Sequence, residues 1–459
     1  MNERYILKRK PKKFLGFRLS GLGVFQNPTF FIVCVLVSVS PLFRASVLPR
    51  AQTLIQIVVA LGVICLVLEK LRAKKPTQTA DSADNKSNLK VSHLQFRKGL
   101  TVSQAFWYVI LPCMILSICS TIFSPHPAMA TESMIMLFFY LIFFYLVLAS
   151  VRTRQDQRTL MWVIVATAVF LCIIGLLELF DIVEFAWWDY SYGGTEPYST
   201  SLTGAYVNHN HIAGFLEMAI PMLLCMFLTR SKSLKVRIGL IFLVLFIIIC
   251  QALTLSRGGW AGTAGALLFM AVVLLLKKGF IHKRLVASFL ISAVFIAVVV
   301  LTSTTVIGRI NTLTQRGIKD NIPFRLITWA STRNMIADNL FTGTGPGTYS
   351  ASSLAYLEPG LAVLPVYAHN DYLHFAADIG VFFIPLMLWL LFLFFRTAFA
   401  KLKSRSRQTM AISLGCMTSV VAILIHSFSD GNLHIPANVV LFIAVTALVL
   451  GRFSHIRAK

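Results

Sequence analysis

The chain has 459 residues, of which 57% are hydrophobic and 13% are charged, and its formal net charge is +24 at pH 7. A soluble protein would carry roughly 25% charged residues, so this composition excludes a soluble globular domain and indicates an integral membrane protein. In a soluble protein such a positive charge would indicate nucleic-acid binding. Here the excess of Lys and Arg in cytoplasmic loops of membrane proteins accounts for it, and no nucleic-acid partner is expected.

Apolar runs of about 20 residues predict an all-α polytopic protein with about twelve transmembrane helices. The predicted spans are 27–46, 51–68, 104–123, 132–150, 159–180, 211–229, 238–255, 258–276, 285–305, 379–395, 409–428 and 433–451. With the N-terminus in the cytoplasm, 34 of the 42 Lys and Arg residues fall in cytoplasmic tails and loops, and each of these loops is basic. A wrong number of spans would break this alternation, so both termini are predicted to be cytoplasmic.

These spans divide the chain into five parts. They are a basic cytoplasmic tail (1–26), spans one to nine (27–305, with a cytoplasmic linker at 69–103 and an outer loop at 181–210), a large outer loop (306–378), spans ten to twelve (379–451) and a short cytoplasmic tail (452–459). The basic tail is expected to lie against anionic membrane lipids. All eight cysteines fall inside predicted spans and no Cys-x-x-Cys pair exists, so neither disulfides nor a thiolate metal site is expected.

The first outer loop combines aromatic and polar side chains. Trp187, Trp188, Tyr190 and Tyr192 could stack on sugar rings, although an interfacial aromatic belt is the favoured interpretation. Asn208-His209-Asn210-His211 opens the sixth span, where these groups suit either sugar hydroxyls or helix capping. A metal site at these histidines is disfavoured, because no carboxylate lies at a helical metal-ligand spacing from them. Glu178 and Glu217 are placed at outer span ends and are assigned no role.

Arg257 stands alone between two apolar segments, inside the run Ser256-Arg257-Gly258-Gly259-Trp260. A guanidinium beside hydrocarbon is costly, so Arg257 is expected to face water or an anionic partner at the outer surface. The alternative is an interfacial arginine that reaches the lipid headgroups. The two glycines would allow a backbone or a ligand to approach closely.

The large outer loop contains a predicted amphipathic helix over Pro323–Asp338, on which Arg325, Trp329 and Arg333 share a face. The two arginines could bind a phosphate or diphosphate, or could form a solvated face. The glycine-rich stretch 343–347 lacks the lysine of a phosphate-binding loop and is expected to form tight turns.

His369 begins the run His369-Asn370-Asp371-Tyr372, which leads into the tenth predicted span with Asn370 or Asp371 as its N-cap. A histidine can act as a general base near neutral pH. The alternative is a capping or core histidine bonded to Asp371. The position of His369 on the same side as Arg257 favours the general base. His426, Asp430 and His434 follow in the last outer loop, also on that side.

The order and spacing of these motifs resemble the O-antigen ligase superfamily. The matching runs are Asn-His-Asn-His-Ile-Ala before span six, Ser-Arg-Gly-Gly after span seven, Thr-Gly-Thr-Gly-Pro-Gly-Thr-Tyr in the large loop and His-Asn-Asp-Tyr-Leu at its end. The resemblance covers roughly residues 200–450, and the first 150 residues are similar only in hydropathy.

The resemblance implies a GT-C-like glycosyltransferase in the bacterial inner membrane, with its active site facing the periplasm. The donor would be a glycan on undecaprenyl diphosphate, the acceptor a lipid A-core sugar or a growing glycan, and no cofactor or metal would be used. His369 would be the base, and Arg257, with Arg325 and Arg333, would hold the diphosphate, because fixed guanidinium groups stabilise the charge that builds on it. The residues that would meet the sugars are Asn208, His209, Asn210, His211, Asn370, Asp371, Tyr372 and Asp430. In-line attack predicts inversion at the anomeric carbon.

Several functions are compatible with the same motifs. A ligase is favoured over a polysaccharide polymerase because the chain is compact and has one dominant outer loop. A protein O-oligosaccharyltransferase ranks third, because those enzymes often carry a further outer domain after the last span. A secondary transporter, from a different class, would need ionisable residues near the bilayer midplane, and the predicted midplanes are nearly free of charge.

Overall fold

The computed structural model describes residues 27–73, 100–183, 201–206, 208–229, 233–277, 283–284, 324–357 and 364–452. These residues fold into helices, and the β pairing found among them is one isolated bridge between Leu100 and Gly451. Nine helices in these ranges are long and apolar enough to cross a membrane. The chain is therefore an all-helical polytopic membrane protein, as predicted.

Nine predicted spans correspond to these helices. They are α2 (Pro49–Ala73), the run from α3 (Val102–Ala105) through the π-helical turn η2 (Phe106–Ile110) to α4 (Leu111–Ile122), α5 (Pro127–Ser150), α6 (Arg154–Leu179), α7 (His209–Thr229), α8 (Leu234–Leu253), α9 (Arg257–Leu276), α14 (Phe383–Leu402) and α15 (Arg407–His426). The first and last predicted spans are the shorter apolar helices α1 (Pro28–Val39) and α16 (Pro436–Leu450). The ninth predicted span, 285–305, lies outside the described residues.

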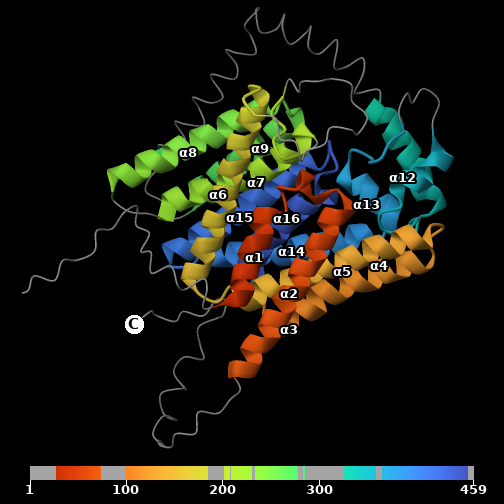
Figure 1. Cartoon of the computed structure of the whole chain (residues 1–459), viewed down its shortest axis with the longest axis horizontal. Coiled ribbons are helices and arrows are strands. Elements are labelled where there is room, and N and C mark those ends of the chain that lie inside the picture. The colour runs from red at the N-terminus through yellow and green to blue at the C-terminus, as the bar shows by residue number, and fades with distance from the viewer. Residues whose placement is uncertain are drawn as a thin grey trace, which may run out of the picture.

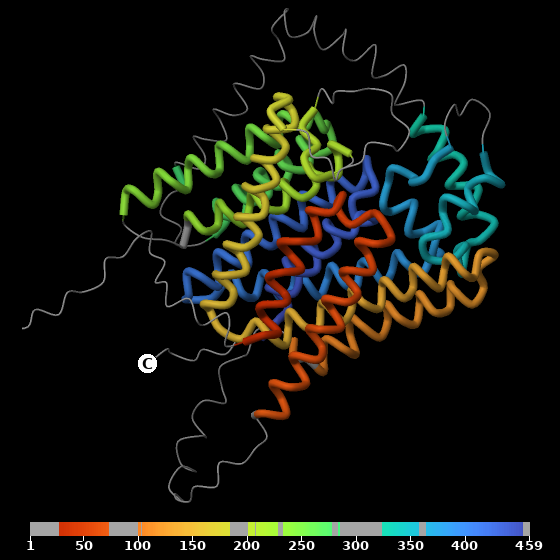
Figure 2. The backbone as a smooth tube through the Cα atoms, viewed as in Figure 1, coloured from red at the N-terminus to blue at the C-terminus, as the bar shows by residue number. Residues whose placement is uncertain are grey.

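The core of the bundle is built around α7 and α15. Within their most apolar windows, 83% of the α7 residues and 72% of the α15 residues are buried inside the protein, against 17% for α14. Helix α15 packs along both α7 and α9, and Figures 1 and 2 show α15 and α16 between the α6–α9 group and the α4–α5 pair. Helices α7 and α15 are thus shielded from lipid, which allows their outer ends to carry polar groups.

The helix ends sort into two sets, as the predicted alternation requires. At the ends predicted to be cytoplasmic, Lys401 Nζ donates to Val449 O at 2.6 Å and Lys277 Nζ donates to Leu402 O at 2.9 Å. At the opposite ends, Leu202 N donates to Leu253 O at 2.9 Å. Loop-proximal residues that the alternation of basic loops assigns to the same side of the membrane therefore contact one another.

The first predicted span is wrong in extent. Helix α1 ends at Val39, and after a turn the residues Arg44, Ala45 and Ser46 all have positive φ angles. Pro41 lacks the N–H that would continue the helical hydrogen bonds, so the chain bends there and returns along α2. Twelve helical residues span only about 18 Å, less than the roughly 30 Å of a bilayer core.

The start of the tenth predicted span is also wrong. Asn370 does cap a helix, because its Oδ1 accepts from the N–H groups of Tyr372 and Leu373. That helix is the short α13 (Asp371–Ile379), which ends at Gly380 with φ 80°, and the membrane-length helix α14 begins at Phe383. The glycine conformation separates the two helices, since residues with a Cβ rarely adopt it. The predicted helix at 323–338 is confirmed over residues 324–338.

Gly380→Ala is expected to lower the free energy of unfolding by about 1–3 kcal/mol, because the conformation at this position is essentially restricted to glycine. The added methyl group would also collide with the carbonyl of Phe341. Thermal unfolding of the detergent-solubilised protein measures the effect. Gly239→Ala in α8 is the matched control, because no atom lies within 4 Å of its added Cβ. Equal unfolding temperatures for both variants would contradict this account.

Candidate active site

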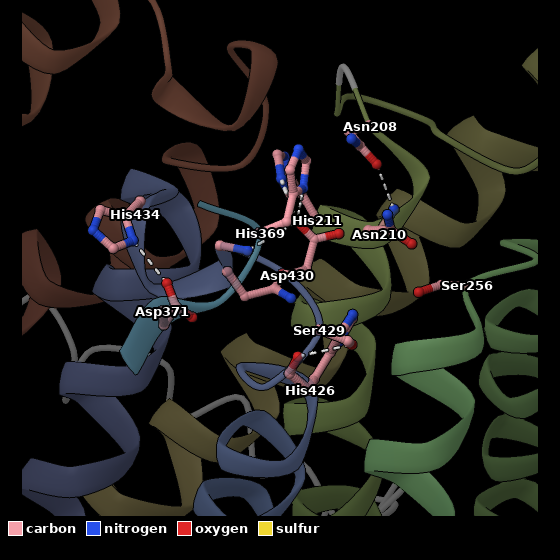
Figure 3. Close-up of polar contacts among 12 residues, drawn as sticks. Asn208, Asn210, His211, Ser256, His369, Asp371, His426, Ser429, Asp430 and His434 are labelled. Carbon is pink, nitrogen blue, oxygen red and sulfur yellow. Dashed lines mark hydrogen bonds and ion pairs between the residues drawn. The ribbon is translucent and has the colours of Figure 1, made fainter. Parts of the chain in front are cut away.

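Polar side chains from five segments meet at the end of the bundle that the sequence predicts to be the outer one (Figure 3). The segments are the start of α7, the first turn of α9, the helix over 324–338, the residues leading into α13, and the turn between α15 and α16. We call this last segment, residues 427–435, the last outer turn; it includes the 3-10 helix η4 (Asn432–His434). The site therefore combines residues that are more than 200 positions apart in the sequence.

Asp430, in the last outer turn, is the carboxylate around which the other groups gather. Its side chain is only 2% exposed, and its Oδ1 lies 3.2 Å from His369 Nδ1 and 4.0 Å from His211 Nε2. Its Oδ2 lies 3.7 Å from a terminal nitrogen of Arg325. One buried anion thus faces two imidazoles and a guanidinium, each carried by a different segment. We call these four residues, Asp430, His369, His211 and Arg325, the Asp430 cluster.

The charge on Asp430 determines how His369 is held. Burial alone would raise the pKa of Asp430, but the hydrogen bond from His369 and the charges of His211 and His426 hold it below its usual value. An ionised carboxylate can only accept hydrogen bonds, so Nδ1 of His369 carries a proton, and in the neutral tautomer that this contact selects the lone pair is on Nε2. His369 is 24% exposed and has φ 50°, a left-handed conformation that is uncommon outside glycine and often occurs at functional sites.

Asp371 is buried and uses both carboxylate oxygens within the protein. Oδ1 lies 2.7 Å from His434 Nδ1, and Oδ2 accepts from Ser427 Oγ at 2.7 Å and from Leu433 N at 3.0 Å. The histidine that pairs with Asp371 is therefore His434 and not His369. Asp371 ties the first turn of α13 to the last outer turn.

The neighbours of Asp371 also have structural partners. Asn370 caps α13, and the Tyr372 hydroxyl donates to Leu424 O at 2.7 Å. At the start of α7, Asn208 Oδ1 accepts from Asn210 N at 2.8 Å, so this asparagine caps the helix. His211 is buried, whereas His209 and Asn210 are half-buried. Trp187, Trp188, Tyr190 and Tyr192, in contrast, lie outside the described residues.

The Ser-Arg-Gly-Gly run forms the N-terminus of α9. Ser256 caps the helix, its Oγ accepting from Gly259 N at 3.1 Å. A Cβ at Gly258 would collide with Ser429 and with the ring of His426, and a Cβ at Gly259 would lie 2.7 Å from Ala213. The glycines therefore let α9 pack directly against α7 and the last outer turn, next to Asp430.

Arg257 is exposed and forms no hydrogen bond or ion pair with any residue that the structure describes. It begins α9, where the helix N-terminus adds a partial positive charge. Because a Cβ on its neighbour Gly258 would meet Ser429, one residue from Asp430, the backbone at Arg257 lies close to Asp430 and its partners. A free cation at this position can receive an anionic ligand.

The helix over 324–338 brings only one of its two arginines to the cluster. Trp329 Nε1 donates to Ala368 O at 3.0 Å, which fixes this helix beside His369. Arg325 lies within ion-pair range of Asp430. Arg333 is exposed and lies two turns further along the helix, about 12 Å away, so the structure separates it from the site.

The glycine-rich stretch forms turns, as expected. Gly343, Gly345 and Gly347 have positive φ angles. Thr344 N donates to Ala377 O at 3.0 Å, and Gly347 N donates to Asp378 Oδ2 at 2.7 Å. These N–H groups hold the C-terminal end of α13 and leave no phosphate cradle.

Sequence reasoning did not anticipate a buried pair beneath the site. Glu217, predicted at an outer span end, lies about two turns inside α7 and is fully buried, with both carboxylate oxygens 3.2 Å from His426 Nδ1. His374 and Asp378 on α13 are buried as well. His374 and Asp378 are four residues apart, and this spacing predicts that their side chains lie on one face of a helix.

Part of the chain that supplies these site residues matches a known protein family. Residues 241–388 match the family model described as O-Antigen ligase. We call this matching segment, residues 241–388, the O-antigen ligase domain, after the family model that it resembles. The match confirms the resemblance seen in the motifs, over a narrower range than residues 200–450. No curated protein matches the chain significantly.

The O-antigen ligase domain includes Arg257, the helix over 324–338, the glycine-rich turns and His369. The start of α7 and the last outer turn lie outside the matched range, yet they supply His211 and Asp430. The candidate active site therefore depends on contacts between the matched domain and the helices that flank it.

Asp371→Ala is expected to lower the unfolding temperature of the protein markedly, because it leaves the Ser427 hydroxyl, the Leu433 N–H and His434 without their acceptor. Buried groups that lose a partner cost about 1–3 kcal/mol each. The measurement is thermal unfolding in detergent. Glu132→Ala is the control, because Glu132 is exposed near the start of α5, and surface substitutions usually stay within about 0.5 kcal/mol. Indistinguishable unfolding curves would show that Asp371 does not tie the two segments together.

Proposed function

We propose that this protein is an inner-membrane glycosyltransferase of the O-antigen ligase type. It moves a glycan from undecaprenyl diphosphate to a sugar hydroxyl of lipid A-core, in a metal-independent and inverting reaction. The observation that carries this proposal is the His369–Asp430 pair, with Arg325 3.7 Å from Asp430 and Arg257 at the start of α9, in a chain whose residues 241–388 match the O-antigen ligase family model.

His369 acts as the general base. Its Nε2 takes the proton of the acceptor hydroxyl, the acceptor oxygen forms a bond to the anomeric carbon, and the bond from that carbon to the diphosphate oxygen breaks. Asp430 accepts from Nδ1 and stabilises the imidazolium that forms, as the carboxylate does in carboxylate–histidine catalytic pairs. The imidazolium loses its proton to solvent after transfer, and the 24% exposure of His369 provides the route.

Arg257 and Arg325 hold the leaving diphosphate. Negative charge builds on its oxygens as the sugar bond breaks, and fixed guanidinium groups stabilise this charge most strongly where water is scarce. Arg257 makes no bond to the described residues, and Arg325 is 3.7 Å from Asp430, beyond hydrogen-bond range. Both therefore retain donors for an anion. Arg333, two turns from the cluster, is left out of this role.

The proposed orientation places both termini in the cytoplasm and the Asp430 cluster in the periplasm, with the large loop at 306–378 on the periplasmic side. The alternation of basic loops supports it, and so do the contacts that sort the helix ends into two sets. A twelve-span GT-C-like architecture belongs to the same proposal. The partners are the lipid-linked donor, the acceptor and membrane lipids, and no cofactor takes part.

A polymerase would use the same donor and the same groups and would differ only in its acceptor. The family match fits both kinds of enzyme, so the choice of the ligase rests on the single dominant outer loop predicted from the sequence. A secondary transporter and a protein O-oligosaccharyltransferase are less well supported, because the former explains neither the O-antigen ligase domain nor the exposed Arg257, and no observation on this chain favours the latter.

His369→Ala is expected to reduce glycan transfer by at least about 100-fold, the range contributed by general base catalysis, while the protein still folds. Purified protein receives a short undecaprenyl-diphosphate glycan with or without lipid A-core, and mass spectrometry reads the products. Glycan on lipid A-core, lost in the variant, establishes the ligase. A longer lipid-linked glycan formed without core establishes the polymerase. Full activity in His369→Ala, or a product with retained anomeric configuration, would refute the mechanism.

Arg257→Lys is expected to lose most transfer activity, because a point charge cannot reproduce the two-pronged contact of a guanidinium with a diphosphate. The same assay measures it. Arg50→Lys is the matched control, since Arg50 is exposed at the start of α2 on the side proposed to be periplasmic. Equal loss in both variants would point to a general effect of arginine replacement and not to a diphosphate contact.

A further inference from the structure

A second polar cluster lies behind the candidate active site, where α13 meets the last outer turn. It consists of His374 and Asp378, one turn apart on α13, and His434 in η4. One potential ligand atom from each residue lies within 4.8 Å of the others. Their side chains are 3%, 4% and 12% exposed, so the cluster is shielded from bulk water.

Each member of this cluster has a buried polar atom without a hydrogen-bond partner among the described residues. These atoms are His374 Nδ1, Asp378 Oδ1 and His434 Nε2. An unsatisfied buried polar atom typically costs about 1–3 kcal/mol, and most native buried groups avoid that cost. The three side chains gather in one cluster, so together they offer unused lone pairs to a shared ligand.

The surroundings of His434 fit a metal ligand. Its Nδ1 lies 2.7 Å from Asp371 Oδ1, so the carboxylate fixes the tautomer and leaves Nε2 as a lone-pair donor. Metal-binding histidines nearly always make such a contact through their other nitrogen, which orients the ring and raises its basicity. Asp378 is positioned similarly, because Gly347 N donates to its Oδ2 at 2.7 Å and Oδ1 remains available.

We propose that His374, Asp378 and His434 bind a divalent first-row transition metal ion, with Zn²⁺ as the best-fitting ion. Two imidazole nitrogens, one carboxylate oxygen and a water molecule make a tetrahedral set of the kind that Zn²⁺ accepts. Bonds of about 2.0–2.2 Å require ligand atoms roughly 3.3 Å apart. The rings of His374 and His434 are stacked with centroids 3.7 Å apart and an angle of 19°, so both rings would have to turn out of this stack to direct a nitrogen at the ion.

The ion would have a structural role. It would join α13 to the last outer turn, and through Asp378 and Gly347 it would also hold the glycine-rich turns. His369 precedes α13, and its partner Asp430 lies in the last outer turn. The ion would thus maintain the distance between the base and its carboxylate, and it would take no part in the transfer step. This inference stands independently of the proposed function.

The test uses the full chain without a histidine tag, in detergent, treated with a chelator and then titrated with Co²⁺. We expect visible absorption bands of tetrahedral Co²⁺ that saturate at one ion per chain and disappear when Zn²⁺ is added. His374→Ala and His434→Ala should abolish the bands. His126→Ala, which changes a histidine before α5, is the matched control and should keep them.

Asp378→Cys provides a test in which a ligand is exchanged and not removed. If Asp378 coordinates the ion, this variant should add an intense near-ultraviolet thiolate-to-cobalt charge-transfer band while remaining folded by size-exclusion chromatography. The proposal is overturned if the wild-type chain shows no Co²⁺ bands, if both alanine variants keep them, or if folded Asp378→Cys lacks the charge-transfer band. None of these readouts depends on glycan transfer, so failure here leaves the proposed function untouched.

Discussion

The interactions of the ionised Asp430 carboxylate are those on which the geometry of the candidate active site depends. A buried anion is costly unless cations or hydrogen-bond donors surround it. At Asp430 these groups are His369, His211 and Arg325, carried by three segments that are distant in sequence. Each of them is drawn to the same point because the charge has no water to stabilise it. The organisation of the candidate site is therefore an electrostatic consequence of burying one aspartate.

A second carboxylate, Asp371, connects the same two segments, but from α13 to the last outer turn. Asp430 reaches from the last outer turn to His369 before α13, while Asp371 reaches from α13 to Ser427, Leu433 and His434 in the last outer turn. The two segments thus hold each other through reciprocal contacts. Such a clamp restrains the φ of 50° at His369, because relaxing that angle would break contacts on both sides.

The membrane explains why these polar groups lie where they do. Glu217 and His426 are fully buried between α7 and α15, the two helices that are most shielded from lipid. Their pairing gives each group a polar partner inside the bundle, which lipid could not do. Gly258 and Gly262 let α9 approach this pair closely, since a Cβ at Gly262 would lie 2.6 Å from Glu217 Oε2. The first turn of α9, with Arg257, is positioned by this packing.

The sequence alone determined the membrane class, nearly all of the long helices and the motifs of the O-antigen ligase domain. These follow from local properties: apolar runs of sufficient length, basic residues between them, and short runs such as Ser256–Trp260. The cap at Asn370 and the helix over 324–338 were predictable for the same reason. Only the tertiary structure decided that Asp430 and not Asp371 faces His369, that Arg325 and not Arg333 reaches the cluster, and that Glu217 lies inside the bundle. Those pairings depend on how far each helix end extends relative to its neighbours. Side-chain packing across the bundle sets these positions, and it produces no repeating residue pattern from which they could be predicted.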